Sequence, residues 1–112
     1  MALTYSQNVF QDIALFELRG KITSESDLEQ LVQETASKSK IIFNLRQLEQ
    51  TNSTGINFMI RTLTRCRING GELLITGLGG NVEKLFQLAK IDSLFTVKVS
   101  DDDAINYFQQ SN

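Results

Sequence analysis

The fold is decided by residues 41–56, which read IIFNLRQLEQTNSTGI. The first five residues form a mostly apolar run, which is typical of a central strand covered on both faces. After a polar connection over residues 46–52, Ser53 opens a segment in which apolar residues recur every three or four positions to about Ile68. This periodicity predicts a helix, and the residues on its buried side are Ile56, Met59, Ile60, Leu63 and Cys66.

Strands and helices alternate on both sides of this unit. Further strands are predicted at residues 3–6, 12–19, 73–75 and 95–99, with a polar turn near Gln7-Asn8 and a break at Gly20. A capping-box motif, Ser26-Asp27-Leu28-Glu29, predicts a first helix that buries Leu28, Leu31, Val32 and Thr35. Later helices are predicted at residues 82–90, burying Val82, Leu85, Phe86 and Ala89, and after Ser100. This order predicts an α/β fold of two layers, with a mixed, largely parallel sheet of four to five strands and about four helices.

Composition narrows the class of protein. The chain has 112 residues and no proline, and it shows no linker, so we expect residues 1–112 to form a single domain. A net charge of −2 offers no basic field for direct nucleic-acid binding. The sequence has neither a signal peptide nor an apolar run long enough to span a membrane, and its lone cysteine suits a reducing compartment. We therefore expect a cytoplasmic protein.

The absence of histidine removes the commonest general base and metal ligand. Three weaker candidates for chemistry remain, and each has a plain structural alternative. Gly77-Leu78-Gly79-Gly80-Asn81 could face a nucleotide phosphate or form a tight connection, and Asp101-Asp102-Asp103 could hold magnesium or begin a helix. Cys66 points inward without a base to activate it. We expect no metal, no cofactor and no catalytic residue.

Ser53 and Thr54 place two hydroxyl groups at the start of the central helix. Such hydroxyls either cap free backbone amides or present a modifiable oxygen to solvent. A phosphate here would lie near the positive end of the helix dipole, so modification would change the surface without unfolding the domain. Both uses remain open from the residues alone.

The opposite side of this helix carries Phe58, Arg61 and Arg65. Wound at about 100° per residue, these three lie well away from the buried stripe that includes Ile56. An aromatic residue beside arginines is typical of a contact with a partner protein. The alternative is that a neighbouring element covers Phe58.

The order of elements, with Asn44-Leu45 leading to Asn52-Ser53-Thr54-Gly55, resembles the STAS family, which includes bacterial anti-sigma-factor antagonists. The resemblance continues through Asn69-Gly70-Gly71, the strand Glu72-Leu73-Leu74-Ile75, the segment from Asn81 to Leu88, and Ile91-Asp92-Ser93-Leu94-Phe95. It implies a domain that switches partners and is not an enzyme. In such antagonists the motif reads Asp-Ser-Ser/Thr-Gly, and its first serine is phosphorylated by a partner that is both serine kinase and anti-sigma factor.

By this resemblance the phosphate acceptor is Ser53, with Thr54 second, and a PP2C-type phosphatase resets the switch. The implied partner-binding residues are Asn52, Ser53, Thr54 and Gly55, to which the helix face adds Phe58, Arg61 and Arg65. This chain has Asn52 where the family has an acid, so a formal charge is missing. The alternative function is therefore a non-phosphorylated adaptor or scaffold in a signalling or lipid-transport complex.

Overall fold

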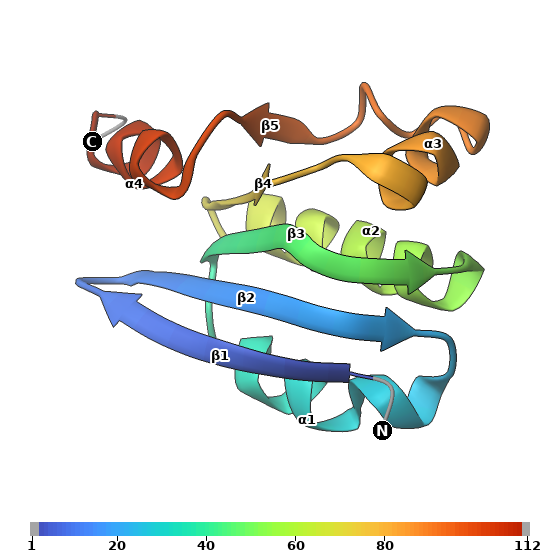
Figure 1. The fold of residues 1–112 in the computed structure, drawn as a ribbon. Coiled ribbons are helices and arrows are strands. Elements are labelled where there is room, and N and C mark those ends of the chain that lie inside the picture. The colour runs from blue at the N-terminus through green and yellow to red at the C-terminus, as the bar shows by residue number, and fades with distance from the viewer. Residues whose placement is uncertain (1–2, 111–112) are drawn as a thin grey trace.

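The computed structural model describes residues 3–110, which contain one five-stranded sheet in the order β1-β2-β3-β4-β5. β1 runs antiparallel to β2, and every other neighbouring pair is parallel. The strands are β1 Leu3–Phe10, β2 Ile13–Ile22, β3 Lys40–Thr51, β4 Glu72–Thr76 and β5 Thr96–Lys98. The helices are α1 Glu25–Thr35, α2 Ser53–Ile68, α3 Gly80–Leu88 and α4 Asp101–Gln110 (Figure 1). The predicted α/β class, with a mixed, mostly parallel sheet, is confirmed.

The main core lies on one face of the sheet. Phe16, Phe43 and Ile75 point from the strands toward apolar residues of α1, α2 and α3. A smaller cluster on the other face joins Ile42 and Leu74 to Phe108 of α4. Burial on both faces explains why β3 and β4 read as continuous apolar runs.

The first four strands run further than the sequence indicated, whereas β5, predicted at residues 95–99, covers only Thr96–Lys98. The turn near Gln7-Asn8 was wrong, because β1 pairs in unbroken register to Phe10 and the chain turns at Gln11, where φ is 57°. β2 passes through Gly20 to Ile22, and β3 continues over the polar residues to Thr51. Cross-strand pairs such as Gly20↔Leu48 hold these polar stretches in the sheet, and hydrophobicity alone gave no sign of them.

The first and third helices also differ from their predictions. α1 begins at Glu25, because Ser24 is the N-cap and Asp27 closes its capping box. The Asp27 carboxylate accepts the backbone N–H groups of Thr23 at 3.0 Å and Ser24 at 3.1 Å. Val32, expected in the core, is 44% exposed, because it lies at the margin of the buried stripe that Leu28, Leu31 and Thr35 form. α3 ends at Leu88, so Ala89 is exposed instead of buried.

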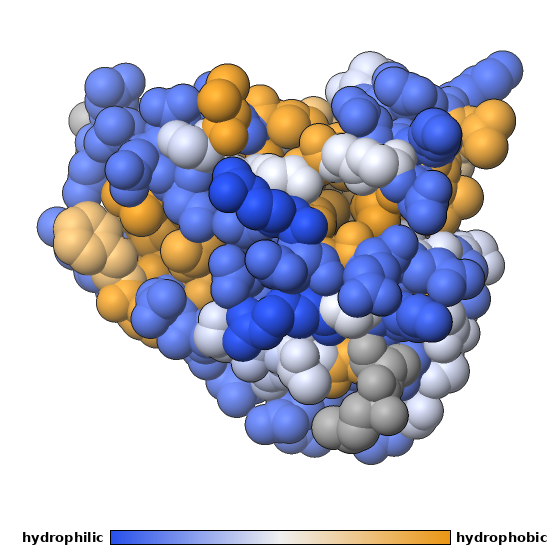
Figure 2. All heavy atoms as spheres, viewed as in Figure 1, coloured by the Kyte–Doolittle hydropathy of each residue, from blue (hydrophilic) through white to orange (hydrophobic). Residues whose placement is uncertain are grey.

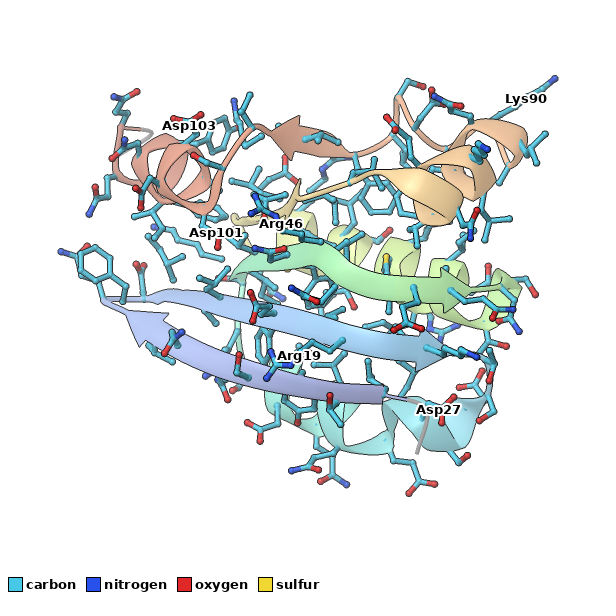
Figure 3. The ribbon with its side chains drawn as sticks, viewed as in Figure 1. Arg19, Asp27, Arg46, Lys90, Asp101 and Asp103 are labelled. Atoms are coloured by element: carbon cyan, nitrogen blue, oxygen red, sulfur yellow. The ribbon has the colours of Figure 1, made fainter. Side chains whose placement is uncertain are left out.

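The acidic run at residues 101–103 does more than begin a helix. The Ser100 hydroxyl caps the backbone N–H of Asp103, as predicted. The Asp101 carboxylate instead turns to the sheet, where it accepts the Thr76 hydroxyl at 2.6 Å and the Asn44 side-chain amide at 3.0 Å (Figure 3). Capping thus explains only part of this run, and Asp101 ties α4 to the middle of β3 and to the end of β4.

Polar side chains cover the part of the viewed sheet face that α4 leaves open. Figure 2 shows hydrophilic residues gathered across the middle of this face, over β1, β2 and β3. Arg19, labelled in Figure 3, donates to Glu17 at 2.8 Å and to Ser6 at 3.5 Å. Within residues 3–110, no helix combines the length and the apolar character needed to cross a membrane.

Candidate functional site

Asn52 holds the start of α2 with both ends of its side-chain amide. It is the N-cap residue with an extended backbone, and its Oδ1 accepts the backbone N–H of Thr54 at 3.0 Å. Its Nδ2 donates to the carbonyl oxygen of Thr23 at 3.1 Å. Because Thr23 lies between β2 and α1, Asn52 connects the start of α2 to the neighbouring loop. The helix begins at Ser53, as the sequence predicted, but the residue that caps it is Asn52.

Ser53 follows as the first residue of α2, and it is exposed. Thr54 is half-buried. Since Asn52 already caps the helix, neither hydroxyl is needed for that task, and neither makes a hydrogen bond to any residue between 3 and 110. The capping alternative for these hydroxyls is therefore wrong, and the Ser53 side chain is presented to solvent.

Gly55 allows α2 to begin close to the sheet. It is buried, and a Cβ added there would overlap the Thr51 Oγ1 atom and lie 3.1 Å from Cγ2 of Ile22. The Thr51 hydroxyl itself donates to the Ile22 carbonyl at 3.0 Å. This close approach of helix and strands fixes the position from which Ser53 projects.

Phe58 does not present an exposed aromatic surface. It is 3% exposed, and its ring stacks on Phe43 with centroids 5.9 Å apart and an interplanar angle of 26°. Of the two alternatives left open for Phe58, cover by neighbouring elements is confirmed and an exposed aromatic contact is wrong, because the sheet and α1 both cover this part of α2. Thr62, one turn later, is buried as well, so Phe58 and Thr62 form a second buried stripe of α2, which the apolar period that starts at Ile56 does not include.

The two arginines on this side have different surroundings. Arg65 donates to the carbonyl oxygens of Lys38 at 2.6 Å and Thr35 at 2.8 Å, so its guanidinium satisfies backbone groups at the end of α1. Arg61 is exposed. A hollow of about 280 Å³ lies between α1 and α2, with Phe58 in its lining beside Val32 and Arg61. Of the three predicted contact residues, Arg61 alone is fully exposed.

The remaining candidates for chemistry are tied into the structure. Burial raises the pKa of the Cys66 thiol, against a lowering influence of Arg65, so the thiol is poorly suited to act as a nucleophile. Gly77 has φ of 68°, and a Cβ there would crowd the backbone of Arg46, so this glycine serves a tight crossing over β3. Residues 3–110 contain no group of three or more Cys, Asp or Glu side chains placed to hold a metal ion.

A family model described as the STAS domain matches residues 6–104. The chain belongs to the STAS domain family. An anti-sigma factor antagonist from Mycobacterium paratuberculosis is similar in fold, with a TM-score of 0.78 at 16% identity, over 95% of this chain and 93% of that one. The anti-sigma factor antagonist SpoIIAA in its unphosphorylated form has a TM-score of 0.75 at 15% identity, covering 95% and 98%.

SpoIIAA from Bacillus in its phosphorylated form gives a TM-score of 0.72 at 16% identity, over 96% of this chain and 99% of that one. At these identities the likeness is one of fold. In this chain, the exposed Ser53 lies at the start of α2, between the Asn52 cap and the buried Gly55.

Proposed function

We propose that residues 1–112 act as one partner-switching regulator of the anti-sigma-factor-antagonist kind, controlled by reversible phosphorylation of Ser53. The observation that carries this proposal is the exposed Ser53 hydroxyl on the first residue of α2, which takes no part in capping the helix. The kinase would be an anti-sigma factor with serine kinase activity, and a PP2C-type phosphatase would remove the phosphate. The domain works by binding in the cytoplasm, and it catalyses no reaction.

The position of Ser53 explains how a phosphate would act. A phosphoserine adds roughly −1.5 to −2 charge, and backbone N–H groups at a helix start stabilise anions. The modified domain therefore stays folded while its surface changes. The unmodified partner surface would include the backbone at Asn52 and Gly55, the Ser53 and Thr54 side chains, and Arg61 further along α2. Phe58 and Arg65 support this surface from within.

Asn52 supports one alternative, a STAS adaptor or scaffold that is not phosphorylated, in a signalling or lipid-transport complex. The side-chain amide donates to Thr23 and accepts from Thr54 at the same time. An ionised aspartate could accept but could not donate. A neutral residue that locks this junction suits a constant binding surface.

The test is phosphorylation by a serine kinase of the anti-sigma-factor class, followed by mapping of the site by mass spectrometry. We expect phosphate on Ser53, none on a Ser53→Ala variant, and a loss of kinase affinity of about tenfold or more in Ser53→Asp, because the added charge opposes docking. Ser93→Asp places the same charge at an exposed loop position and should bind normally.

Two results would reject the switch. One is an unmodified Ser53 under an active kinase, and the other is equal kinase affinity of Ser53→Asp and Ser93→Asp. Partner binding that is lost in Arg61→Ala but insensitive to phosphatase would instead support the adaptor.

A further inference from the structure

β1 is an edge strand that lacks the usual protection of an edge. Its residues read LTYSQNVF, with no charge and no proline. It pairs with β2 in continuous register from Leu3↔Gly20 to Phe10↔Ile13, so no bulge interrupts it, and within residues 3–110 it has no other strand neighbour. Natural sheets block such edges with lysine, proline, bulges or a covering element. β1 therefore offers its outer backbone groups to a further strand.

A groove runs between this edge and α1. The hollow has a volume of about 410 Å³ and is lined by Leu3, Thr4, Tyr5 and Gln7 from β1 and by Gln30 and Glu34 from α1. Figure 1 shows α1 lying along the edge of the sheet that β1 forms. An exposed strand edge beside a helix is a geometry in which extended peptides add to a sheet. The groove thus has the form of a peptide site.

Tyr5 provides an unused polar group in this groove. Its ring packs at 5.9 Å from that of Phe16, and its hydroxyl is buried without a hydrogen-bond partner in the described part of the chain. Burial raises the pKa of Tyr5, and the Glu34 carboxylate raises it further through its negative charge and its attraction for the hydroxyl proton, although the two groups do not form a hydrogen bond of standard geometry. A buried O–H without a well-formed hydrogen bond is costly, and the backbone carbonyl of an added strand could satisfy it.

The negative charge of α1 indicates which kind of peptide segment would bind in the groove. Residues Glu25–Thr35 contain four acidic residues and no lysine or arginine. Glu34 lies one helical turn beyond Gln30 and gives the α1 wall of the groove its negative charge. A second copy of this chain fits poorly, because pairing β1 with β1 would bring two acidic helices together. A basic segment is complementary.

We propose that an extended segment with lysine or arginine side chains binds in this groove as a sixth strand beside β1, with a basic residue opposite Glu34. The site is separate from Ser53 at the start of α2, and it does not depend on phosphorylation. Backbone pairing would supply affinity, and the acidic wall of α1 would supply selectivity.

The probe is the blocked peptide VKVTVKV, titrated into the labelled full chain and followed by backbone amide NMR, with VEVTVEV as the matched acidic peptide. We expect shifts concentrated in β1 and in the groove side of α1, and affinity for the basic peptide about tenfold or more higher than for the acidic one. Added salt should reduce the difference, because the charges lie near the surface.

Three variants separate the two parts of the proposal. Glu34→Gln should weaken the basic peptide by about threefold to fivefold, whereas Glu29→Gln, which lies about 140° around α1 from Glu34, should leave it unchanged. Gln7→Lys places a like charge on the edge and should abolish binding at an unchanged unfolding temperature. Shifts outside β1, equal affinity for both peptides, or concentration-dependent dimerisation through β1 would each overturn the proposal.

Discussion

At the scale of single residues, Asn52 determines how α2 begins. Its side chain accepts from Thr54 and donates to Thr23, two hydrogen bonds that involve opposite ends of one amide. The family motif places an acid here. Compared with an ionised aspartate, Asn52 has a hydrogen-bond donor but lacks a negative charge. The consequence is a junction that is held by a neutral residue, with the adjacent Ser53 left free.

Replacing Asn52 with Asp tests what this exchange does. The carboxylate can still cap α2, since Asp and Asn are comparable N-caps, but it loses the donation to Thr23 and faces that carbonyl oxygen with a negative charge. We expect a loss of about 1 kcal/mol in the free energy of unfolding, measured by urea denaturation at neutral pH. Asn57→Asp, exposed in the next turn, is the control. Equal stability of Asn52→Asp and the unmodified chain would show that the Thr23 contact contributes nothing.

The same residues show what a sequence can reveal at this scale. The position of Ser53 at a helix start was predictable, because the apolar period of 3.6 begins there and hydroxyl residues favour such ends. The identity of the cap was not. Asn52 and Ser53 are both good N-caps, and only the packing of Gly55 against Thr51 decides where the helix begins.

At the scale of elements, α2 is packed on two sides. Met59 and Leu63 are buried in the main core, and Phe58 both stacks on Phe43 of the sheet and lines the hollow beside α1 with Thr62. Arg65 completes this contact by donating to the last carbonyls of α1 and its following turn. The arginine therefore joins two helices, and Arg61, one turn earlier, is left for the surface.

Arg65→Met should separate these roles. Methionine keeps much of the apolar stem but removes the guanidinium donors, so two backbone carbonyls lose charge-assisted hydrogen bonds. We expect a loss of about 1–2 kcal/mol in the free energy of unfolding, a value reduced for the partial exposure of Arg65. Arg61→Met should change stability by less than about 0.5 kcal/mol but weaken partner binding. Equal effects of the two changes on unfolding would contradict this division.

Element boundaries were predictable where local chemistry determines them. The helix Ser53–Ile68 was predicted almost to the residue, because Asn69-Gly70-Gly71 stops it and Gly70 has φ of 80°. The start of α1 was placed two residues late, since Ser26-Glu29 and Ser24-Asp27 both fit a capping pattern. The polar end of β3 and the burial of Phe58 depend on neighbours distant in sequence, and no local pattern reports them.

At the scale of the whole molecule, polar side chains join elements that are far apart in the sequence. Asp101 links α4 to β3 and β4, Arg65 links α2 to the end of α1, and Asn52 links α2 to the loop before α1. The alternation of strands and helices predicted the layers, but these links were not predictable, because their partners are 25 to 57 residues apart for Asp101 and about 30 for the others. They place the helices on the sheet.

Stability toward acid is a property of the whole domain to which Asp27 contributes. The backbone N–H of Thr23, and then that of Ser24, hold the pKa of the Asp27 carboxyl below its ordinary value of 3.8. In the unfolded chain this pKa returns to its ordinary value, so the unfolded state binds the proton more readily. The stabilisation is therefore fully present above about pH 5 and is lost as the pH falls through the lowered pKa of the folded state.

Asp27→Asn should remove this part of the acid dependence. The amide of asparagine can still accept one N–H, but it does not ionise, so the variant should be less stable near neutral pH and should lose less stability between about pH 5 and pH 2. Urea midpoints measured across this range give the comparison. Asp92→Asn, at an exposed position, is the control and should follow the unmodified chain. An Asp27→Asn curve parallel to that of the unmodified chain would mean that the capping carboxylate has no part in acid unfolding. The loss of stability at low pH would then arise at other carboxylates, such as Asp12, whose pKa is lowered by its contact with Lys40.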